Sequence, residues 1–470
     1  RIESKRFPKL HLLGSNGDFF SQEEVRDIVA YADARGIRVV PEFDIPGHAT
    51  AWFVGHPELA SAPGPYKIES AFGVFNPTMD PTKASTYAFL EAFLGEMCAL
   101  FPDAYFHIGG DENNGKQWDA NPDIQHFMQQ HKLKNNHALQ SYFNQRILAI
   151  LTENGKQMIG WDEILQPDMP TNIVIQSWRG KKALIKAANK GYDVMLSNGY
   201  YIDLCKPAAH HYLNDPLPAG SLKSEKARAH VLGGEATMWG ELVSRETIDS
   251  RIWPRTCAIA ERLWSAEEVR DVADMYRRLG LAALRLEEVG LTHLRNPEML
   301  MRRACNGQGI APLQTLLQVV EPLKGYRRHG QAITYSTKLP LSRLPDMAVP
   351  DAQIARGFAS TMAEFLKAPD ESRRFLLKLM LENWRDNHAR FLRLAEQAPA
   401  LREIIPISTN LNALAIVGID LLDMQERGVA SLEKRALMEK TIARAKEPVA
   451  ESELVIVNAI ENLKNEVFLK

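Results

Sequence analysis

One stretch of the sequence ends an apolar run in two glycines followed by two adjacent acids. It reads Tyr-Phe-His-Ile-Gly-Gly-Asp-Glu over residues 105–112, and its acids are Asp111 and Glu112. The glycines let the backbone bend and let a ligand approach closely. Adjacent carboxylates repel each other, so one should keep its proton to a higher pH than the other. Such a pair suits acid and base catalysis on a glycosidic bond, although a bare Asp-Glu pair more often caps a helix.

Three tryptophans stand at comparable positions after apolar runs. They are Trp161 in Gly-Trp-Asp-Glu, Trp178 in Gln-Ser-Trp-Arg-Gly and Trp239 in Thr-Met-Trp-Gly-Glu. Aromatic walls are how proteins hold sugar rings and small apolar groups in a pocket. A single tryptophan is more often a core residue, but three at matching positions favour a binding pocket.

Further polar residues could complete such a pocket. Tyr201 offers a hydrogen-bond donor, and Asp203 and Glu241 offer acceptors for hydroxyl groups. Taken singly, each is more typical of a surface. The motif from Asp44 to His48 reads Asp-Ile-Pro-Gly-His and predicts a turn at Pro-Gly. His48 could orient a carboxylate or be a hydrogen-bonded core histidine, and both interpretations stay open.

Other functional classes find little support in the sequence. The formal net charge of the 470 residues is −2, so there is no basic excess that would indicate nucleic-acid binding. No apolar run is long enough to span a bilayer. The histidines at 210 and 211 are adjacent, which is poor chelating spacing, and the four cysteines are far apart. We therefore expect no metal site.

Alternating patterns predict an α/β fold over the first half of the chain. Short apolar runs separated by longer helical patterns indicate a parallel sheet. Six such strands fit either a doubly wound sheet or most of a (β/α)8 TIM barrel. The candidate residues follow nearly every strand, which favours the barrel, because a doubly wound sheet gathers its site at one switch point. The predicted strands are residues 37–43, 104–109, 157–161, 172–178, 192–196 and 231–234, and the clearest helices are residues 21–35, 85–100 and 137–154.

The character of the sequence changes near residue 296. Residues 372–395, 410–425 and 431–446 carry apolar side chains at helical spacing, and residues 335–350 look irregular. We therefore predict a catalytic barrel over residues 1–295, a linker near residues 294–297, and a mostly α-helical C-terminal domain over residues 296–470.

Taken together, the motifs of residues 1–265 resemble glycoside hydrolase family twenty, the β-N-acetylhexosaminidases. The His-x-Gly-Gly-Asp-Glu motif carries most of the resemblance, and the order of the other motifs supports it. These other motifs lie at residues 2–4, 7–10, 44–48, 160–163, 177–178, 201–203, 239–241 and 253–255. The resemblance implies an exo-acting hydrolase that releases terminal GlcNAc or GalNAc from N-acetylated glycans or chitooligosaccharides with retention. It also implies that the substrate's acetamido group is the nucleophile, through an oxazolinium intermediate, with no cofactor.

The resemblance also implies a role for each candidate residue. Glu112 would protonate the departing oxygen and then activate water, and Asp111 would hold the acetamido group and stabilise its charge. Tyr201 would donate a hydrogen bond to the acetamido carbonyl oxygen. The remaining residues would enclose the acetamido methyl (Trp161, Trp178, Trp239), bind sugar hydroxyls (Asp203, Glu241) or support the carboxylates (Asp44, His48, His107).

The resemblance departs from the family pattern at the N-terminus. Family members have two further barrel strands before the position of Arg1, and these supply an Arg and an Asp. We therefore expect a barrel that lacks its first two strands in this chain, and an upstream segment typical of a periplasmic or secreted protein. Without that segment, the chain's own activity stays open. A sugar-binding protein without activity and a disaccharide-releasing relative remain alternatives, and sugar preference, linkage and oligomeric state are undetermined.

Overall fold

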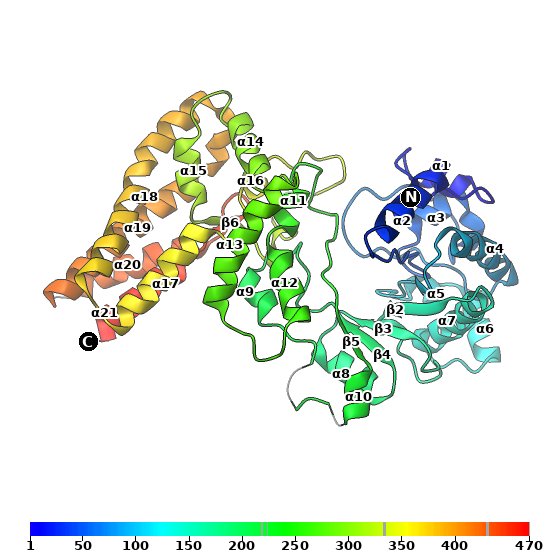
Figure 1. The fold of residues 1–470 in the computed structure, drawn as a ribbon. Helices are drawn as coiled ribbons and strands as arrows, with labels where there is room; N and C mark the ends of the chain where they lie inside the picture. Colours follow the sequence, from blue (N-terminus) through cyan, green and yellow to red (C-terminus); the bar gives the residue numbers. More distant parts are fainter. Residues whose placement is uncertain (218–219, 223, 332–334, 429–431, 470) are drawn as a thin grey trace. The chain divides into compact units, whose positions relative to one another are not determined.

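The structure, a computed structural model, describes residues 1–217, 220–222, 224–331, 335–428 and 432–469 (Figure 1). The chain divides into two compact units. The first unit comprises Arg1–Tyr200 and Asp215–Glu235, and the second comprises Tyr201–Asn214 and Ala236–Lys470. The predicted domain boundary at residue 295 does not coincide with this division and stays a prediction. A linker was predicted near residues 294–297, but helix α14 (Arg295–Ala304) begins there.

A five-stranded parallel sheet forms the centre of the first unit. Its strands lie side by side in the order in which they occur in the chain, and each strand is parallel to its neighbours. This sequential order is that of a barrel wall and lacks the switch point of a doubly wound sheet. All five runs were predicted from the sequence to within three residues at each end. The strands are β1 (Tyr105–His107), β2 (Gln157–Trp161), β3 (Val174–Ser177), β4 (Asp193–Leu196) and β5 (Val231–Gly234).

The predicted strand at residues 37–43 is shorter and displaced in the structure. Pairing with β1 is confined to Pro41–Ile45, where a single parallel bridge joins Glu42 to His107. The Phe43 N–H donates to the His107 carbonyl oxygen at 3.0 Å, and the Ile45 N–H donates to that of Ile108 at 3.0 Å. Residues 37–40 make no strand pairing within the described part of the chain. Apolar character alone therefore placed this strand about four residues too early.

Amphipathic helices cover the sheet of the first unit. Ser21 is the N-cap residue of helix α2 (Gln22–Asp33). Its side chain accepts from the Glu24 N–H, and the Glu24 carboxylate accepts from the Ser21 N–H, so the predicted N-cap is a full capping box. Helices α4 and α7 bury apolar faces, as their 3.6-residue periodicity predicted. The helices are α1 (Lys9–Gly14), α2 (Gln22–Asp33), α3 (Thr50–Gly55), α4 (Ala84–Leu100), α5 (Lys116–Ala120), α6 (Pro122–Gln130), α7 (Asn136–Glu153), α8 (Lys181–Asn189) and α10 (Glu225–Ala229).

The second unit is mostly helical, as predicted for the C-terminal part of the chain. Helices α9, α12 and α13 share a small core, and α17 to α21 contribute to a larger one around the buried Trp384. An antiparallel pair, β6 (Val320–Pro322) and β7 (Ser452–Leu454), was not predicted. The helices are α9 (Ala208–Tyr212), α11 (Ile248–Ile252), α12 (Arg255–Trp264), α13 (Val272–Glu288), α14 (Arg295–Ala304), α15 (Ala311–Leu317), α16 (Leu344–Met347), α17 (Gln353–Lys367), α18 (Glu371–Gln397), α19 (Ile405–Arg427), α20 (Leu432–Lys446) and α21 (Val457–Leu469).

One helical stretch, Pro399–Arg427, is long and apolar enough to cross a membrane by length and composition. The expectation that no run reaches this length is therefore wrong. Within the structure, 61% of its most apolar window is buried. The α19 helix packs against α18, α20 and α21, which is the environment of a core helix in a bundle.

Candidate active site

The loop after β1 requires glycine at both positions before the acids. Gly109 has φ +68°, and a Cβ atom there would lie 1.9 Å from Asp44 Oδ1. Gly110 has φ +95°, and its N–H donates to the same Asp44 oxygen at 3.1 Å. A Cβ on Gly110 would lie 2.7 Å from the Ile164 side chain. The predicted bend is therefore present, and the group that lies against these glycines is the Asp44 side chain of the protein itself. The close approach of a ligand stays a prediction.

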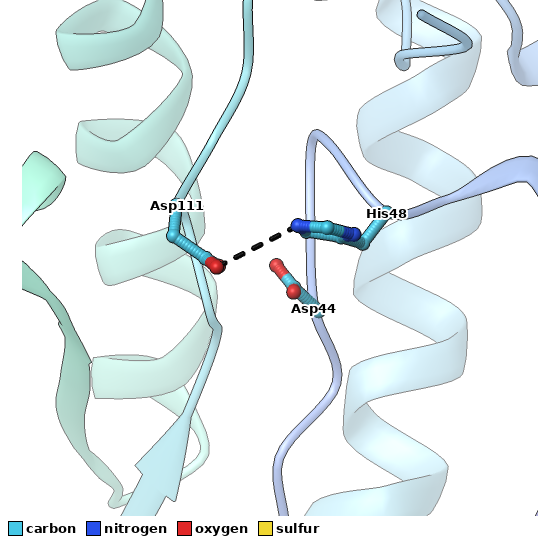
Figure 2. Close-up of side chains that lie close together, drawn as sticks. All are labelled: Asp44, His48 and Asp111. Carbon is cyan, nitrogen blue, oxygen red and sulfur yellow. Dashed lines mark ion pairs between the residues drawn. The ribbon is translucent and has the colours of Figure 1, made fainter. Parts of the chain in front are cut away.

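His48 lies between the two adjacent acids. Its Nε2 atom is 3.6 Å from Asp111 Oδ2 (Figure 2) and 3.5 Å from Glu112 Oε2. His48 and Glu112 both have positive φ, 47° and 50°, which L-residues other than glycine adopt at a cost in energy. Such strain is typical of side chains held for a function. Of the two interpretations of His48, the structure favours the one in which it orients carboxylates.

The surroundings of Glu112, His48 and Asp44 shift the pKa values of these side chains. Burial raises the pKa of Glu112, and the neighbouring Asp111 charge raises it further. The hydrogen bond to Asp111 raises the pKa of His48, with both acids adding to the effect against its partial burial. Burial, followed by the charges of Asp111 and Glu42, raises the pKa of Asp44 well above its usual range. Glu112 is thus suited to donate a proton.

Asp44, His48 and Asp111 together form a tight cluster. One ligand-type atom from each lies within 4.8 Å of the others, a spacing that a metal ion could also use. The raised pKa values of Asp44 and His48 mean that these groups can hold protons beside Asp111 instead. The Asp111 Oδ1 atom is buried, and no N–H group of the described residues donates to it. An amide N–H of a ligand would therefore find an acceptor here.

Trp161, the last residue of β2, is held by several groups of the first unit. Its indole Nε1–H donates to Glu42 Oε1 at 2.9 Å, and its ring meets the His107 ring edge-on with centroids 5.1 Å apart. Burial lowers the pKa of His107 to about 4, so this imidazole is neutral at physiological pH. Burial raises the pKa of Glu42 to about 7, opposed by the Trp161 hydrogen bond and aided by Asp111 and Glu235. His107 thus supports the wall of the site.

Trp178 follows β3 directly and is anchored to the turn after β2. Its backbone N–H donates to Asp162 Oδ2 at 2.9 Å, and its indole Nε1–H donates to Glu163 Oε2 at 3.1 Å. Arg179 stacks over the indole ring and pairs with Glu163 at 2.6 Å. The charges of Glu163 and Arg179 act in opposite directions on the pKa of Glu112. Glu163 and Arg179, which contact the Trp178 ring, therefore belong to the electrostatic surroundings of Glu112.

The remaining four candidates form a separate cluster in the second unit. The rings of Tyr201 and Trp239 lie 6.0 Å apart at 66°, and a parallel bridge joins Tyr201 to Thr237. Burial raises the pKa of Asp203 to about 7, with Glu241 adding to the shift and backbone hydrogen bonds opposing it. The structure thus brings Tyr201, Asp203, Trp239 and Glu241 together.

A buried arginine supports this second cluster. Arg255, from the Trp-Pro-Arg motif, donates to the carbonyl oxygens of Ile202 at 2.9 Å and Lys206 at 2.7 Å, and also to that of Arg251. A buried guanidinium that satisfies three backbone carbonyls ties the segment around Asp203 to helix α12. The sequence motif was recognised, but this bracing role was not predicted.

The sequence analysis did not predict that Glu42, Glu163 and Arg179 lie close enough to Asp111 and Glu112 to interact electrostatically with them. Glu42 precedes Asp44 by two residues on an extended segment, where side chains two apart share a face. Glu163 and Arg179 stand within the two tryptophan motifs. Alternation on one face was therefore a usable signal for Glu42, whereas the pairing of Glu163 with Arg179 depends on how β2 and β3 lie side by side.

Residues 1–267 match the glycosyl hydrolase family 20 catalytic domain, and the chain belongs to this family. It is 38% identical over 326 residues to a beta-hexosaminidase of Porphyromonas gingivalis, covering 63% of this chain and 42% of that protein. It is 35% identical over 300 residues to the human beta-hexosaminidase subunit beta, covering 62% of this chain and 53% of the relative. The chain thus spans about half the length of these curated relatives.

Solved structures show the same relationship. The X-ray structure of a Flavobacterium johnsoniae chitobiase aligns over 99% of this chain and 71% of its own, with 42% identity and a TM-score of 0.94. The exo-β-N-acetylglucosaminidase of Vibrio harveyi, solved in complex with N-acetylglucosamine, aligns over 62% of this chain and 51% of its own, with 29% identity and a TM-score of 0.55. The predicted fold class, a TIM barrel followed by a helical C-terminal part, is confirmed.

Proposed function

We propose that the full-length protein is a retaining exo-β-N-acetylhexosaminidase. It would hydrolyse terminal GlcNAc or GalNAc residues of N-acetylated glycans or chitooligosaccharides, with the acetamido group of the substrate as nucleophile. The observation that carries the proposal is the adjacent pair Asp111 and Glu112 held around His48, with the pKa of Glu112 raised by burial and by the charge of Asp111. The family membership and the relatives named beta-hexosaminidase support it.

In the first step, Glu112 donates its proton to the glycosidic oxygen as the bond to the anomeric carbon breaks. The acetamido carbonyl oxygen forms the new bond to that carbon, giving an oxazolinium ion. Asp111 accepts the acetamido N–H through its buried oxygen and stabilises the positive charge that develops. In the second step, Glu112 takes a proton from the water that opens the ring.

The other residues carry the roles that the family resemblance implies. Trp161, Trp178 and Trp239 enclose the acetamido methyl group, and Tyr201 donates to the acetamido carbonyl oxygen. Asp203 and Glu241 accept hydrogen bonds from sugar hydroxyl groups. His48, His107 and Asp44 support the carboxylates. These assignments rest on the matching motifs, together with the local contacts within each cluster.

The stereochemistry of the product tests the reaction. Two successive inversions at the anomeric carbon give net retention, so hydrolysis of an aryl β-N-acetylglucosaminide should release the β-anomer of N-acetylglucosamine first. Proton NMR recorded during the first minutes distinguishes the two anomers before they equilibrate. Initial release of the α-anomer would show direct attack by water and overturn the proposal, and a protein that binds the sugar without hydrolysis would be the sugar-binding alternative.

A further inference from the structure

Trp161 is almost fully buried, with 3% of its surface exposed, and contacts fix it from three directions. Its backbone N–H donates to the Gly109 carbonyl oxygen at 3.0 Å, in the loop that leads to the two acids. One edge of its ring lies against His107. The third contact is the hydrogen bond from indole Nε1–H to Glu42 Oε1 at 2.9 Å.

Glu42 reaches two strands with the same oxygen. Its Oε1 atom accepts from Trp161 on β2 and lies 3.4 Å from His107 Nδ1 on β1. His107 Nδ1 itself accepts from the Gly109 N–H at 3.0 Å, so the imidazole is connected to the glycine loop before Asp111. The carboxyl oxygen thus lies beside an acceptor nitrogen of the imidazole, and its hydrogen bond goes to the indole ring.

We propose that Glu42 is a positioning residue for the acetamido pocket: its carboxyl oxygen holds the Trp161 indole in place through the hydrogen bond to Nε1–H. The proposal rests on the proposed function, in which Trp161 contacts the acetamido methyl group. Glu42 itself touches no reacting atom. Its effect on catalysis passes through Trp161, because a tilted indole ring would misplace the acetamido oxygen relative to the anomeric carbon, and small misplacements of reacting atoms reduce rates strongly.

A double-mutant cycle in the full-length protein tests the proposal on an aryl β-N-acetylglucosaminide. We expect Glu42→Ala to lower kcat/KM about 10- to 100-fold. Trp161→Phe removes the indole N–H, so adding Glu42→Ala to it should change kcat/KM less than about twofold further. The matched control is Trp178→Phe, whose native indole donates to Glu163. In that background Glu42→Ala should keep its full effect.

A conservative substitution separates positioning from general support of the fold. The side-chain oxygen of Glu42→Gln can accept the same hydrogen bond, so this variant should recover to within about fivefold of wild type. Should Glu42→Ala fail to fold, Glu42→Leu takes its place in the cycle, because leucine fills a similar volume without an acceptor. Losses that multiply in the Trp161→Phe background, or wild-type rates in Glu42→Ala, would overturn the proposal.

Failure of the proposed function would look different. A wild-type protein that hydrolyses no N-acetylglucosaminide overturns that function by itself. The same cycle is then measured as the dissociation constant for N-acetylglucosamine by calorimetry. Non-additive losses in binding would still support Glu42 as the residue that positions Trp161, and additive losses would overturn it.

Discussion

Replacing Glu112 with glutamine should lower kcat/KM on alkyl β-N-acetylglucosaminides by about 10²–10⁴-fold, the usual contribution of a general acid. The amide keeps the shape of the side chain but has no proton to give to the departing oxygen. Aryl substrates with good leaving groups need less protonation, so their first step should be affected least. Steady-state rates on a series of leaving groups measure this dependence.

The pH profile supplies a second readout for the same variant. Because the pKa of Glu112 is raised by burial and by Asp111, the wild-type protein keeps its acid protonated to a higher pH, and kcat/KM falls as the pH rises through that pKa. Glu112→Gln should lack this alkaline limb. Glu91→Gln, on the exposed side of α4, makes the same chemical change away from the cluster and should behave as wild type. Unchanged rates in Glu112→Gln would remove the assignment of the acid.

Replacing Asp111 with asparagine should lower kcat/KM about 10²–10³-fold on every N-acetyl substrate, whatever its leaving group. Asparagine retains a hydrogen-bond acceptor but loses the negative charge that stabilises the oxazolinium ion. This loss slows the attack by the acetamido group and does not change how the leaving group is protonated. The slope of rate against leaving-group pKa should therefore stay close to that of wild type. The matched control is Asp27→Asn, on the exposed face of α2.

A leaving-group dependence in Asp111→Asn like that of Glu112→Gln would show that the two acids share one role. The roles would then have to be reassigned within the pair. The structure argues for separate roles, because His48 approaches one oxygen of each acid while Asp111 Oδ1 stays buried without an N–H donor among the described residues.

Much of the first unit could be predicted from the sequence because its strands and helix ends depend on residues that are close together in the sequence. The bounds of β2 and β5 follow directly from short apolar runs, and the capping box at Ser21 follows from residue spacing. The glycines at 109 and 110 predicted a bend, and in the structure the Asp44 side chain lies against it.

The remainder depends on contacts between distant segments. The strand expected at residues 37–43 pairs only over Pro41–Ile45, since its pairing is set by where β1 lies. Glu42 reaches Trp161 across 119 positions of sequence, and Arg255 reaches Ile202 across 53. The apolar pattern at residues 410–425 covers only part of Pro399–Arg427, because the 3-10 turn at Pro399–Ile404 runs directly into helix α19.

The central claim is that the acetamido group of the substrate, and no carboxylate of the protein, attacks the anomeric carbon. The most direct measurement compares kcat/KM for 4-nitrophenyl β-N-acetylglucosaminide with that for 4-nitrophenyl β-glucoside, which has the same leaving group and lacks the internal nucleophile. A positioned intramolecular nucleophile is worth effective concentrations of about 10⁵ M or more, so we expect a ratio of about a thousandfold or greater. Comparable rates on the two sugars would point to a carboxylate nucleophile and contradict the account.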